Sequence, residues 1–591
     1  MNLNVFEKLD RHWRSAVIAL WLIFCGVSLY QGWRAIRWFA LSDTDDNMRI
    51  MQVRALLDGQ NWFDLRQYRL NPPYGADIHW SRIVDLPIAL IKLTLSPLIG
   101  GAQAERAAVA LAPLIPMLVA FYALAASARR LLAPGAFLFA ILLAYSASSL
   151  KGYWAPLRID HHGWQVAMLA VMMFGLVDRH KLRGGILAGL ATSVSLAIGL
   201  EMLIYLAAAG ALIGLMWIRT RDEAPRLLGY GVSLGGGTAL LFLLFTSYAN
   251  RVPVCDAMSP VWLSMMLVAA AMAILLSRLS PSSLWVRLLA AGIAGVGLAA
   301  VYVIAWPGCL GRLEGSSPEL EQMWLNRVRE AMPIYRHGWK TTINSLTLPV
   351  MGLVGYGTMI WRTRKQGDEW TYWTALTILA VLPCLLLLWQ TRASGAAQML
   401  AVPGATALAW LVTTWLLAKT NIVVRVAGIL LAFAIFSGTI GQYLTSLIPE
   451  KKPSAATIAV RQAARKCPAL SSLRPIALLP KGTVLTHVDL GPRLISVTHH
   501  DAIAGPYHRN QADILAVMRA FRGTAEAAHR TVQARRIDYV LVCPNLAEST
   551  VYRADAPNGF YTQLVRGRVP DWLEPIELPR NSPYRMWRVI R

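Results

Sequence analysis

Long apolar segments recur along the first three quarters of this sequence and constrain its fold more than any other feature. A stretch of about 20 apolar residues is long enough to cross the hydrocarbon core of a bilayer as a helix. Because 55% of the residues are hydrophobic and 15% are charged, the segments predict a polytopic α-helical membrane protein rather than a soluble domain. We place about thirteen spans at residues 14–31, 105–127, 135–150, 163–178, 184–199, 202–218, 227–247, 261–277, 285–306, 344–361, 371–389, 398–417 and 421–446.

Basic residues indicate how the segments are oriented. The first segment follows basic residues and is not followed by a small-residue cleavage site, so we expect a retained helix and an N-terminus in the cytoplasm. Short loops rich in Lys and Arg fall on the side of the N-terminus, as the positive-inside rule requires. An odd number of spans then places the C-terminal part on the opposite side. These basic loops are residues 129–130, 179–183, 219–226, 278–287 and 362–365.

One further apolar stretch, residues 86–100, lies between the first two spans. Pro87, Lys92 and Pro97 interrupt it, which argues against a fourteenth span. Counting it as a span would also place the two acidic clusters of the chain on opposite sides of the membrane. We therefore expect an interfacial helix in the first external loop.

The chain changes in character after Ile448. A Pro-Glu-Lys-Lys-Pro sequence at 449–453 ends the apolar part, and the remaining residues have ordinary polar content. We divide the chain into a transmembrane domain, 1–448, and an extracytoplasmic domain, 449–591. Short β-rich runs alternate there with helical patterns such as 510–522, which favours a small α/β fold. The β-rich runs are residues 475–480, 483–489, 494–498 and 539–542.

Six cysteines differ in their surroundings. Two of them, Cys25 and Cys384, lie within apolar segments, and the other four lie in predicted external regions. An oxidising compartment would allow the four to form two disulfides. The alternative, six free and partly buried thiols, stays open because spacing alone does not establish geometry. The two pairs are Cys255 with Cys309 and Cys467 with Cys543.

The net charge of +24 raises the question of a nucleic-acid partner. Many of the basic residues fall in short cytoplasmic loops, where topology and anionic lipid headgroups account for them. We therefore expect membrane lipids, and no nucleic acid, as partners of this charge.

Two acidic clusters fall at segment ends on the predicted outer face. Asp43, Asp45 and Asp46 lie in the first external loop, and Asp160 and His162 lie in the second. Charged residues are costly near hydrocarbon, so two clusters on one side suggest a shared polar site. Carboxylate oxygens suit Mg²⁺ or Mn²⁺, and the imidazole shifts the preference toward Mn²⁺. An isolated Asp-x-Asp is also typical of a helix N-cap.

These residues carry a resemblance to the STT3 family, the catalytic subunits of oligosaccharyltransferase, within the GT-C class of membrane glycosyltransferases. The chain is most similar to the archaeal branch, which has Asp-His-His in the second external loop. Gln165 replaces the Glu that the family has three residues after this motif. The similar stretches are Asp43 with Arg49 six residues on, Trp62-Phe63-Asp64, Asn71-Pro72-Pro73-Tyr74-Gly75, Leu111-Ala112-Pro113-Leu114, Asp160-His161-His162, Val328-Arg329-Glu330-Ala331-Met332-Pro333, and Arg392 before Ala401-Val402-Pro403.

The resemblance implies roles for most of these residues. The metal ligands would be Asp43, Asp160 and His162, and the cation Mn²⁺ or Mg²⁺. Catalytic carboxylates would be Asp43, Asp45, Asp46 and Glu330, with Asp43 orienting or deprotonating the acceptor. Arg392, Arg49 and His161 would bind the phosphate of the donor lipid, although Arg392 lies about one helical turn earlier than the family pattern expects.

One departure concerns the acceptor. The family's Trp-Trp-Asp-Tyr-Gly motif, which reads the Ser or Thr of a glycosylation sequon, is absent, and His487-Val488-Asp489-Leu490-Gly491 is its nearest equivalent. Without the two Trp side chains, transfer to Asn in proteins is in doubt. Asp489, His508 and Arg509 would instead bind another acceptor, or they are ordinary turn and surface residues.

The resulting expectation is a membrane glycosyltransferase of the bacterial inner membrane that works on the periplasmic face. It would transfer a sugar or oligosaccharide from a polyprenyl-(pyro)phosphate donor to a glycan, lipid or protein acceptor, with inversion and assisted by a metal. Two alternatives stay open. One is a metal-independent transferase that uses a polyprenyl-monophosphate sugar, and the other is a flippase or transporter of lipid-linked sugars, which would also have many spans and buried charges.

Overall fold

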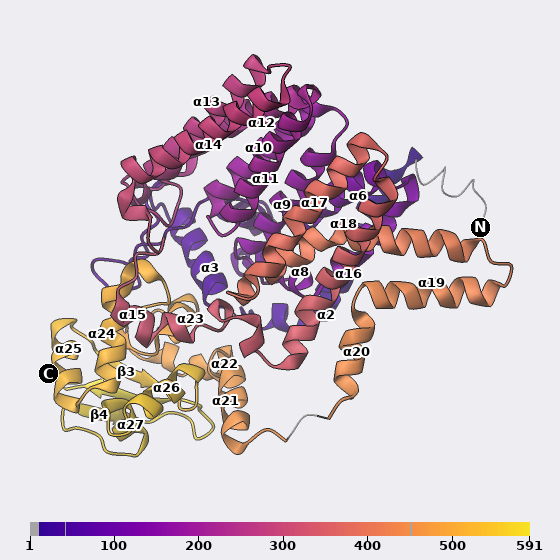
Figure 1. Ribbon diagram of the computed structural model, residues 1–591. Helices are drawn as coiled ribbons and strands as arrows, with labels where there is room; N and C mark the ends of the chain where they lie inside the picture. Colours follow the sequence, from indigo (N-terminus) through magenta and orange to yellow (C-terminus); the bar gives the residue numbers. More distant parts are fainter. Residues whose placement is uncertain (1–10, 42, 450–451, 591) are drawn as a thin grey trace.

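The computed structural model describes residues 11–41, 43–449 and 452–590. Within these ranges, nine helical spans are long and apolar enough to cross a membrane. They form the upper part of Figure 1. These spans are α2 (Trp13–Arg37), α5 with α6 (Gly101–Leu111 and Leu114–Leu131), α10 (Lys181–Ile198), α12 (Ala224–Phe245), α13 (Pro260–Leu279), α14 (Leu284–Ala305), α16 (Trp339–Thr363), α17 (Gly367–Leu386) and α18 (Ser394–Leu417).

Three shorter apolar helices and one bent pair account for the rest of the predicted spans. The pair, α19 (Ile422–Phe436) and α20 (Thr439–Leu447), is bent by 78°. The shorter helices are α7 (Phe137–Ser146), α9 (His162–Val177) and α11 (Leu203–Arg219). Each predicted apolar segment therefore coincides with a helix or a bent helix pair, and the predicted helical membrane fold is confirmed.

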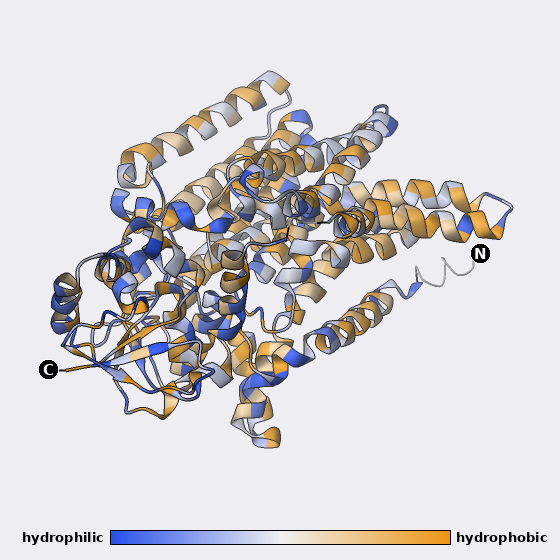
Figure 2. Ribbon diagram, turned by 90° about the horizontal axis from the view of Figure 1, so that it is seen from below, coloured by the Kyte–Doolittle hydropathy of each residue, from blue (hydrophilic) through white to orange (hydrophobic). Residues whose placement is uncertain are grey.

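Close backbone contacts set the packing of the helical part. Gly355 on α16 and Gly404 on α18 approach so closely that a Cβ atom at either position would collide with the backbone of the other helix. Small residues at such crossings let membrane helices pack tightly. Large apolar side chains such as Leu240, Leu289 and Ile293 are exposed on the long helices, whose residues are mostly hydrophobic in the colouring of Figure 2.

Shorter helices lie between the spans. The segment between α2 and α5 keeps its predicted name, the first external loop. In it, α3 (Thr44–Leu57) carries the first acidic cluster, and α4 (Asp85–Ile99) coincides with the expected interfacial helix. The others are α8 (Ser148–Tyr153) before the second acidic cluster and α15 (Pro318–Met323) in the loop between α14 and α16.

The C-terminal part is a small α/β unit below the helices in Figure 1, built on a sheet of five strands in the order β2-β1-β3-β5-β4. Strand β1 is parallel to β2 and β3, whereas β5 is antiparallel to β3 and β4. The strands are β1 (Thr483–Leu485), β2 (Asp501–Ala502), β3 (Tyr539–Val542), β4 (Leu573–Ile576) and β5 (Arg585–Val589). The helices are α21 (Ala455–Lys466), α22 (Leu470–Leu473), α23 (Gly491–Val497), α24 (Gln511–Arg522), α25 (Ala525–Ala534), α26 (Ala547–Asp555) and α27 (Phe560–Val565).

The two faces of this sheet pack on different partners. Val540 and Val542 face a core formed with α24, α25 and α27, and Leu320 of α15 joins that core. Leu541 faces the opposite core, which includes α23 and residues of the first external loop such as Met48 and Trp80. Because strand side chains alternate between faces, β3 contributes to both cores. One core lies within the C-terminal unit, and the other joins that unit to the first external loop.

The edge of the sheet is also paired with the first external loop. The backbone N–H of Asn71 donates to the carbonyl of Ala502 at 2.8 Å, and that of Ala502 donates to Arg69 at 3.0 Å. The Arg69 guanidinium contacts the carboxylate of Asp501 at 3.0 Å. The outer edge of β2 is thus hydrogen-bonded to this loop, so it is not an unpaired strand edge.

Two of the predicted strands are wrong. Residues 475–480 contain a 3-10 turn (Ile476–Leu478), and residues 494–498 lie mostly in α23. Pro492 lies in the first turn of α23, where proline is favoured, and Leu494 and Ile495 are buried on its inner side. A short apolar run does not separate a strand from a helix by itself. The strand at 539–542 is confirmed at its predicted bounds, and the strand at 483–489 is confirmed in its first three residues.

Both predicted disulfides are confirmed. Cys255 is bonded to Cys309, and Cys467 is bonded to Cys543. The first joins two loops of the helical part, and the second joins the residue after α21 to the residue after β3. Cys25 and Cys384 are free.

Candidate functional site

The first acidic cluster lies at the N-terminus of α3. The carboxylate of Asp43 accepts a hydrogen bond from the backbone N–H of Asp45 at 3.0 Å and so caps the helix. Asp45 and Asp46 follow in the first turn, where the helix dipole favours negative charge. The helix-cap interpretation of Asp43 is confirmed, and the second carboxylate oxygen is left for other partners.

Arg158 joins this cluster to the second external loop. Its Nη1 lies 2.6 Å from Asp43 Oδ2 and 3.4 Å from Asp46 Oδ2, and its Nη2 lies 2.7 Å from Asp160 Oδ2. The backbone N–H of Asp160 also donates to Asp46 Oδ1 at 3.1 Å. The two acidic clusters therefore meet around one guanidinium.

Burial of several carboxylates at one place changes their protonation. The pKa of Asp45 is raised to about 8 by burial and by the charges of Asp43 and Asp160, with a further contribution from Glu330. Burial and neighbouring carboxylates also raise the pKa of Asp46, against the effect of Arg158. Burial would raise the pKa of Asp160 as well, but His162 and Arg158 hold it below its usual range. Burial therefore favours the protonated form of Asp45 and Asp46, whereas His162 and Arg158 favour the ionised form of Asp160.

Two histidines continue the site beyond Asp160. His162 Nδ1 lies 3.2 Å from Asp160 Oδ2, and the ring stacks on Tyr153 and on His161. His161 Nε2 forms a hydrogen bond with Glu201 Oε1 at 2.8 Å. Glu201 lies in the short connection between the apolar helices α10 and α11. This connection places its carboxylate beside the imidazole of His161.

The groups around Arg158 fit a divalent cation by their chemistry. Oxygens of Asp43 and Asp160 and the imidazole of His162 are the donor types that Mn²⁺ or Mg²⁺ accept. Asp160 Oδ2 and His162 Nδ1 are buried, and neither has a well-aligned hydrogen-bond partner within the described part of the chain. In this structure, Arg158 contacts the carboxylates of Asp43 and Asp160, which are two of the three expected metal ligands.

The predicted Glu330 and Arg392 come together on two neighbouring 3-10 turns, η6 (Arg329–Ala331) and η8 (Thr391–Ala393). Arg392 Nη2 lies 3.6 Å from Glu330 Oε1, and both side chains are partly exposed, at 34% and 59%. The charge of Glu330 acts on Asp45 of the acidic cluster. The pair therefore faces the same region as the carboxylates and remains open to a ligand.

Arg49 lies in a different environment. It is 1% exposed, its Nη1 contacts Asp85 at 2.9 Å, and its guanidinium lies 4.5 Å from the ring centre of Trp80. Arg82 contacts the same carboxylate at 3.2 Å. This buried network anchors α3 to the start of α4, and contact of Arg49 with a donor phosphate stays a prediction.

The three predicted acceptor residues fall into two groups. Asp489 has an exposed side chain. The neighbouring protein removes part of the water around its carboxylate, and this desolvation, together with the charges of Glu548 and Asp43, raises the pKa of Asp489 to about 7. His508 and Arg509 instead bind Asp256, with His508 Nε2 2.6 Å from Oδ2 and Arg509 Nη2 2.7 Å from Oδ1. Of the three, Asp489 is the one whose charge acts on the acidic cluster.

The residues that take the place of the tryptophan motif are mostly part of the core. His487 is fully buried, and its Nε2 accepts a hydrogen bond from the backbone of Cys543 at 3.2 Å. Burial lowers its pKa to about 3, so the ring is neutral. Val488 and Leu490 are buried as well. Within this stretch, Asp489 alone has an exposed side chain.

Sequence reasoning missed three residues of this region. Arg158 received no role, although a basic residue two positions before the carboxylate of Asp160 is a usual ion-pair partner. Glu201 had a signal in its position, since it is an acidic residue between two predicted spans. Asp256 had no signal beyond its place next to Cys255, because its partners come from distant parts of the chain.

Three solved structures of an oligosaccharyltransferase from the archaeon Archaeoglobus fulgidus have this fold. The structure with an inhibitory peptide and a dolichol-phosphate matches with a TM-score of 0.67 and 15% identity over 96% of this chain and 73% of that one. The structure with a tethered acceptor peptide containing an NVT sequon matches with a TM-score of 0.65 and 14% identity over 93% and 72%. The apo form matches with a TM-score of 0.63 and 16% identity over 95% and 73%.

These matches define the fold of the chain as GT-C type, with the C-terminal unit included in the match. The particular fold that it shares is that of the archaeal oligosaccharyltransferase AglB. No protein-family model matches the sequence. No curated protein matches it either.

Proposed function

We propose that this protein is a membrane glycosyltransferase that transfers a sugar or oligosaccharide from a polyprenyl-(pyro)phosphate donor to an acceptor outside the cytoplasm. The observation that carries the proposal is the meeting of Asp43, Asp46 and Asp160 around Arg158 in a GT-C-type fold. Burying the carboxylates of Asp46 and Asp160 beside that of Asp43 is costly, so the cluster is more readily explained by chemistry than by stability.

Exposure separates the roles of these carboxylates. The side chains of Asp46 and Asp160 are 0% exposed, whereas that of Asp43 is 36% exposed. We therefore assign orientation or deprotonation of the acceptor to Asp43. Asp46 and Asp160 hold Arg158 and position the end of the second loop. Asp45, in the first turn of α3 beside Asp43, contacts an oxygen of the substrates.

The reaction is a single displacement with inversion. The acceptor attacks the anomeric carbon as the bond from that carbon to the phosphate oxygen breaks. The electron pair leaves with the lipid (pyro)phosphate, and the proton of the acceptor passes to the carboxylate of Asp43. Arg392, 34% exposed beside Glu330, binds the departing phosphate.

A divalent cation, Mn²⁺ or Mg²⁺, would be held by Asp43, Asp160 and His162. When bound, it supplies positive charge that stabilises the leaving phosphate. An Archaeoglobus fulgidus structure of the same fold was solved in complex with Zn and sulfate. His161 is fixed by Glu201 and orients the neighbouring His162, on which its ring stacks.

The location follows from the disulfides and the charge pattern. Both disulfides need an oxidising compartment, and the basic loops face the other way. These observations support a multi-pass protein of the bacterial inner membrane with the site and the C-terminal unit in the periplasm. A lipid-linked donor and a glycan, lipid or protein acceptor would both reach the site there.

Comparison of cells with and without the protein tests this proposal. Mass spectrometry of cell-envelope glycans and secreted proteins should show the loss of one glycan when the gene is deleted. The wild type and Asp58→Asn should restore it, because Asp58 is an exposed residue at the C-terminal end of α3. Asp160→Asn should not restore it. Full restoration by Asp160→Asn would overturn the proposed site.

A further inference from the structure

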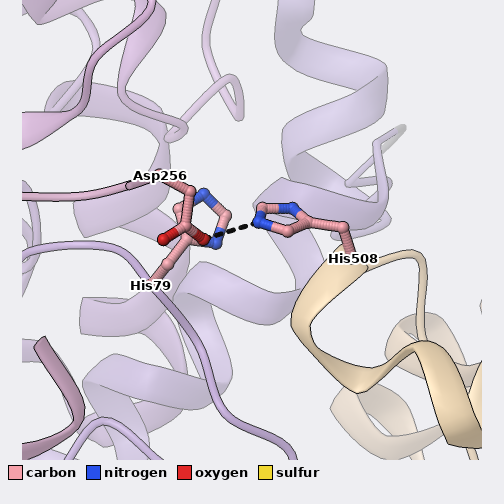
Figure 3. A group of neighbouring side chains, drawn as sticks. All are labelled: His79, Asp256 and His508. Atoms are coloured by element: carbon pink, nitrogen blue, oxygen red, sulfur yellow. Dashed lines mark hydrogen bonds and ion pairs between the residues drawn. The ribbon is translucent and has the colours of Figure 1, made fainter. Parts of the chain in front are cut away.

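Three residues from distant parts of the chain form a second cluster of metal-ligand type. His79 lies in the first external loop, Asp256 follows the disulfide-bonded Cys255, and His508 begins a 3-10 turn of the C-terminal unit. One ligand atom from each lies within 4.8 Å of the other two. Figure 3 shows the carboxylate of Asp256 directed at the imidazole of His508, with His79 alongside.

Neighbouring contacts hold each of the three in place. The Asp256 loop is tied to the loop of Cys309 by the disulfide. Asn510, two residues after His508, exchanges two hydrogen bonds with the backbone of Asp77, at 2.8 and 3.0 Å. His79, two residues after Asp77, is thereby fixed relative to His508. Such preformed geometry lowers the cost of binding an ion.

His79 is the member of the cluster that lacks a partner. Its Nδ1 is buried and has no hydrogen bond within the described residues. An imidazole nitrogen without a hydrogen bond is available to bind a metal.

A small cavity adjoins the cluster. It has a volume of about 10 Å³, and its lining combines apolar side chains with polar residues that include His79, Asp256, Asn250 and Thr246. That volume matches a single water molecule. Three protein ligands with one water in the fourth position make up a common tetrahedral zinc site.

We propose that His79, Asp256 and His508 form a binding site for a divalent transition-metal ion of the Zn²⁺ type. Two imidazoles and one carboxylate suit Zn²⁺, and they suit Mg²⁺ less well. The site joins the first external loop, the disulfide-bonded loop and the C-terminal unit. A bound ion would therefore fix the C-terminal unit over the acidic cluster, and this inference stands whether or not the proposed transferase activity is correct.

The positive charge of Arg509 opposes the binding of such an ion. Arg509 contacts both oxygens of Asp256, with Nε 2.7 Å from Oδ2 and Nη2 2.7 Å from Oδ1. Asp77 lies 3.4 Å from Arg509 Nη1 and offers it a second anion. The two carboxylates together outweigh the single guanidinium, so the cluster remains favourable for a cation.

Zinc binding by the purified full-length protein tests the proposal. The protein should carry no histidine tag and should bear Asp160→Ala, so that the acidic cluster does not contribute a metal. After equilibration with ZnCl₂ and gel filtration, elemental analysis should find one zinc per chain. His79→Ala or His508→Ala should raise the Kd for zinc by about tenfold or more, because each removes one of three protein ligands. His499→Ala, an exposed histidine of the same unit, should not change it.

His508→Cys guards against a variant that fails to fold. Cysteine is itself a zinc ligand, so this variant should keep the zinc that His508→Ala loses. Zinc X-ray absorption of the parent protein should show two imidazole nitrogens. Equal zinc content in His508→Ala and His499→Ala, or no zinc retained by the parent protein, would overturn the proposal.

Discussion

Arg158 Nη2 lies 2.7 Å from Asp160 Oδ2, and the same guanidinium reaches Asp43 at 2.6 Å from the opposite side. The guanidinium of Arg158 thus joins two loops that are about a hundred residues apart in sequence. The first loop contributes the N-terminus of α3, and the second contributes the residues that lead into α9.

Removal of this guanidinium should destabilise the protein. In Arg158→Ala, the buried carboxylates of Asp46 and Asp160 lose their positive partner, and we expect a cost on the order of 3 kcal/mol. Arg158→Lys should lose less, because it keeps the charge but not the several contacts of the planar group. Thermal unfolding in detergent measures both variants.

Mn²⁺ should raise the melting temperature of Arg158→Ala more than that of the wild type, and an equal effect would argue against a cation site at these carboxylates.

Metal removal should abolish turnover. Excess EDTA should reduce the cleavage of the lipid-linked donor by orders of magnitude, and Mn²⁺ or Mg²⁺ should restore it, because a pyrophosphate leaving group concentrates negative charge. If turnover persists undiminished in EDTA, the metal-independent alternative with a monophosphate donor gains support.

The stability of the C-terminal unit should depend on Asp489. Its pKa of about 7 lies above the usual value near 3.8, so the folded state binds the proton more tightly than the unfolded state does. This contribution to stability is fully present below pH 3.8 and is lost as the pH rises through 7. Asp489→Asn should therefore melt higher than the wild type at pH 8 and at the same temperature at pH 4.

A second aspartate serves as the control for this prediction. Asp571 is exposed on the same unit, so Asp571→Asn serves as the matched variant with the same change of charge. A melting temperature of Asp489→Asn that follows the wild type at every pH would contradict the proposed repulsion by Glu548 and Asp43.

The acceptor should not be an Asn-x-Ser/Thr sequon. Two missing tryptophan walls would cost a peptide pocket several kcal/mol of burial, at about 2 to 3 per large side chain. His487, which falls within the equivalent stretch, is fully buried and does not replace them. In a reconstituted assay, a peptide with a sequon should be no better an acceptor than the matched peptide without one. Transfer that requires the sequon would contradict this expectation.

The sequence predicted most of the fold because membrane helices are set by local composition. Every predicted span has a helix, including the short segments at α7 and α11, since hydrocarbon leaves the backbone few other options. The C-terminal unit was harder. Residues 494–497 form a helix, not a strand, because burial against the first external loop decides between the two.

The candidate site was predicted in its carboxylates but not in its contacts. Asp43 and Asp160 were predicted from the resemblance of their motifs to the STT3 family, and the structure brings them together around Arg158. Asp256 and Glu201 were not predicted, because their partners, His508 and His161, come from other elements. Arg49 was predicted from the same resemblance, whereas its burial against Asp85 depends on the fold of the loop.

Cleavage of a lipid-linked sugar by the purified protein tests the central claim most directly. The full-length protein, reconstituted in vesicles with a polyprenyl-linked oligosaccharide and a mixture of envelope acceptors, should release the polyprenyl (pyro)phosphate, detected by mass spectrometry of the lipids. Asp160→Asn should slow this release by about a hundredfold or more, whereas Asp58→Asn should not. Intact donor carried across the vesicle membrane at the same rate by the wild type and Asp160→Asn, without cleavage, would contradict the account and identify a transporter.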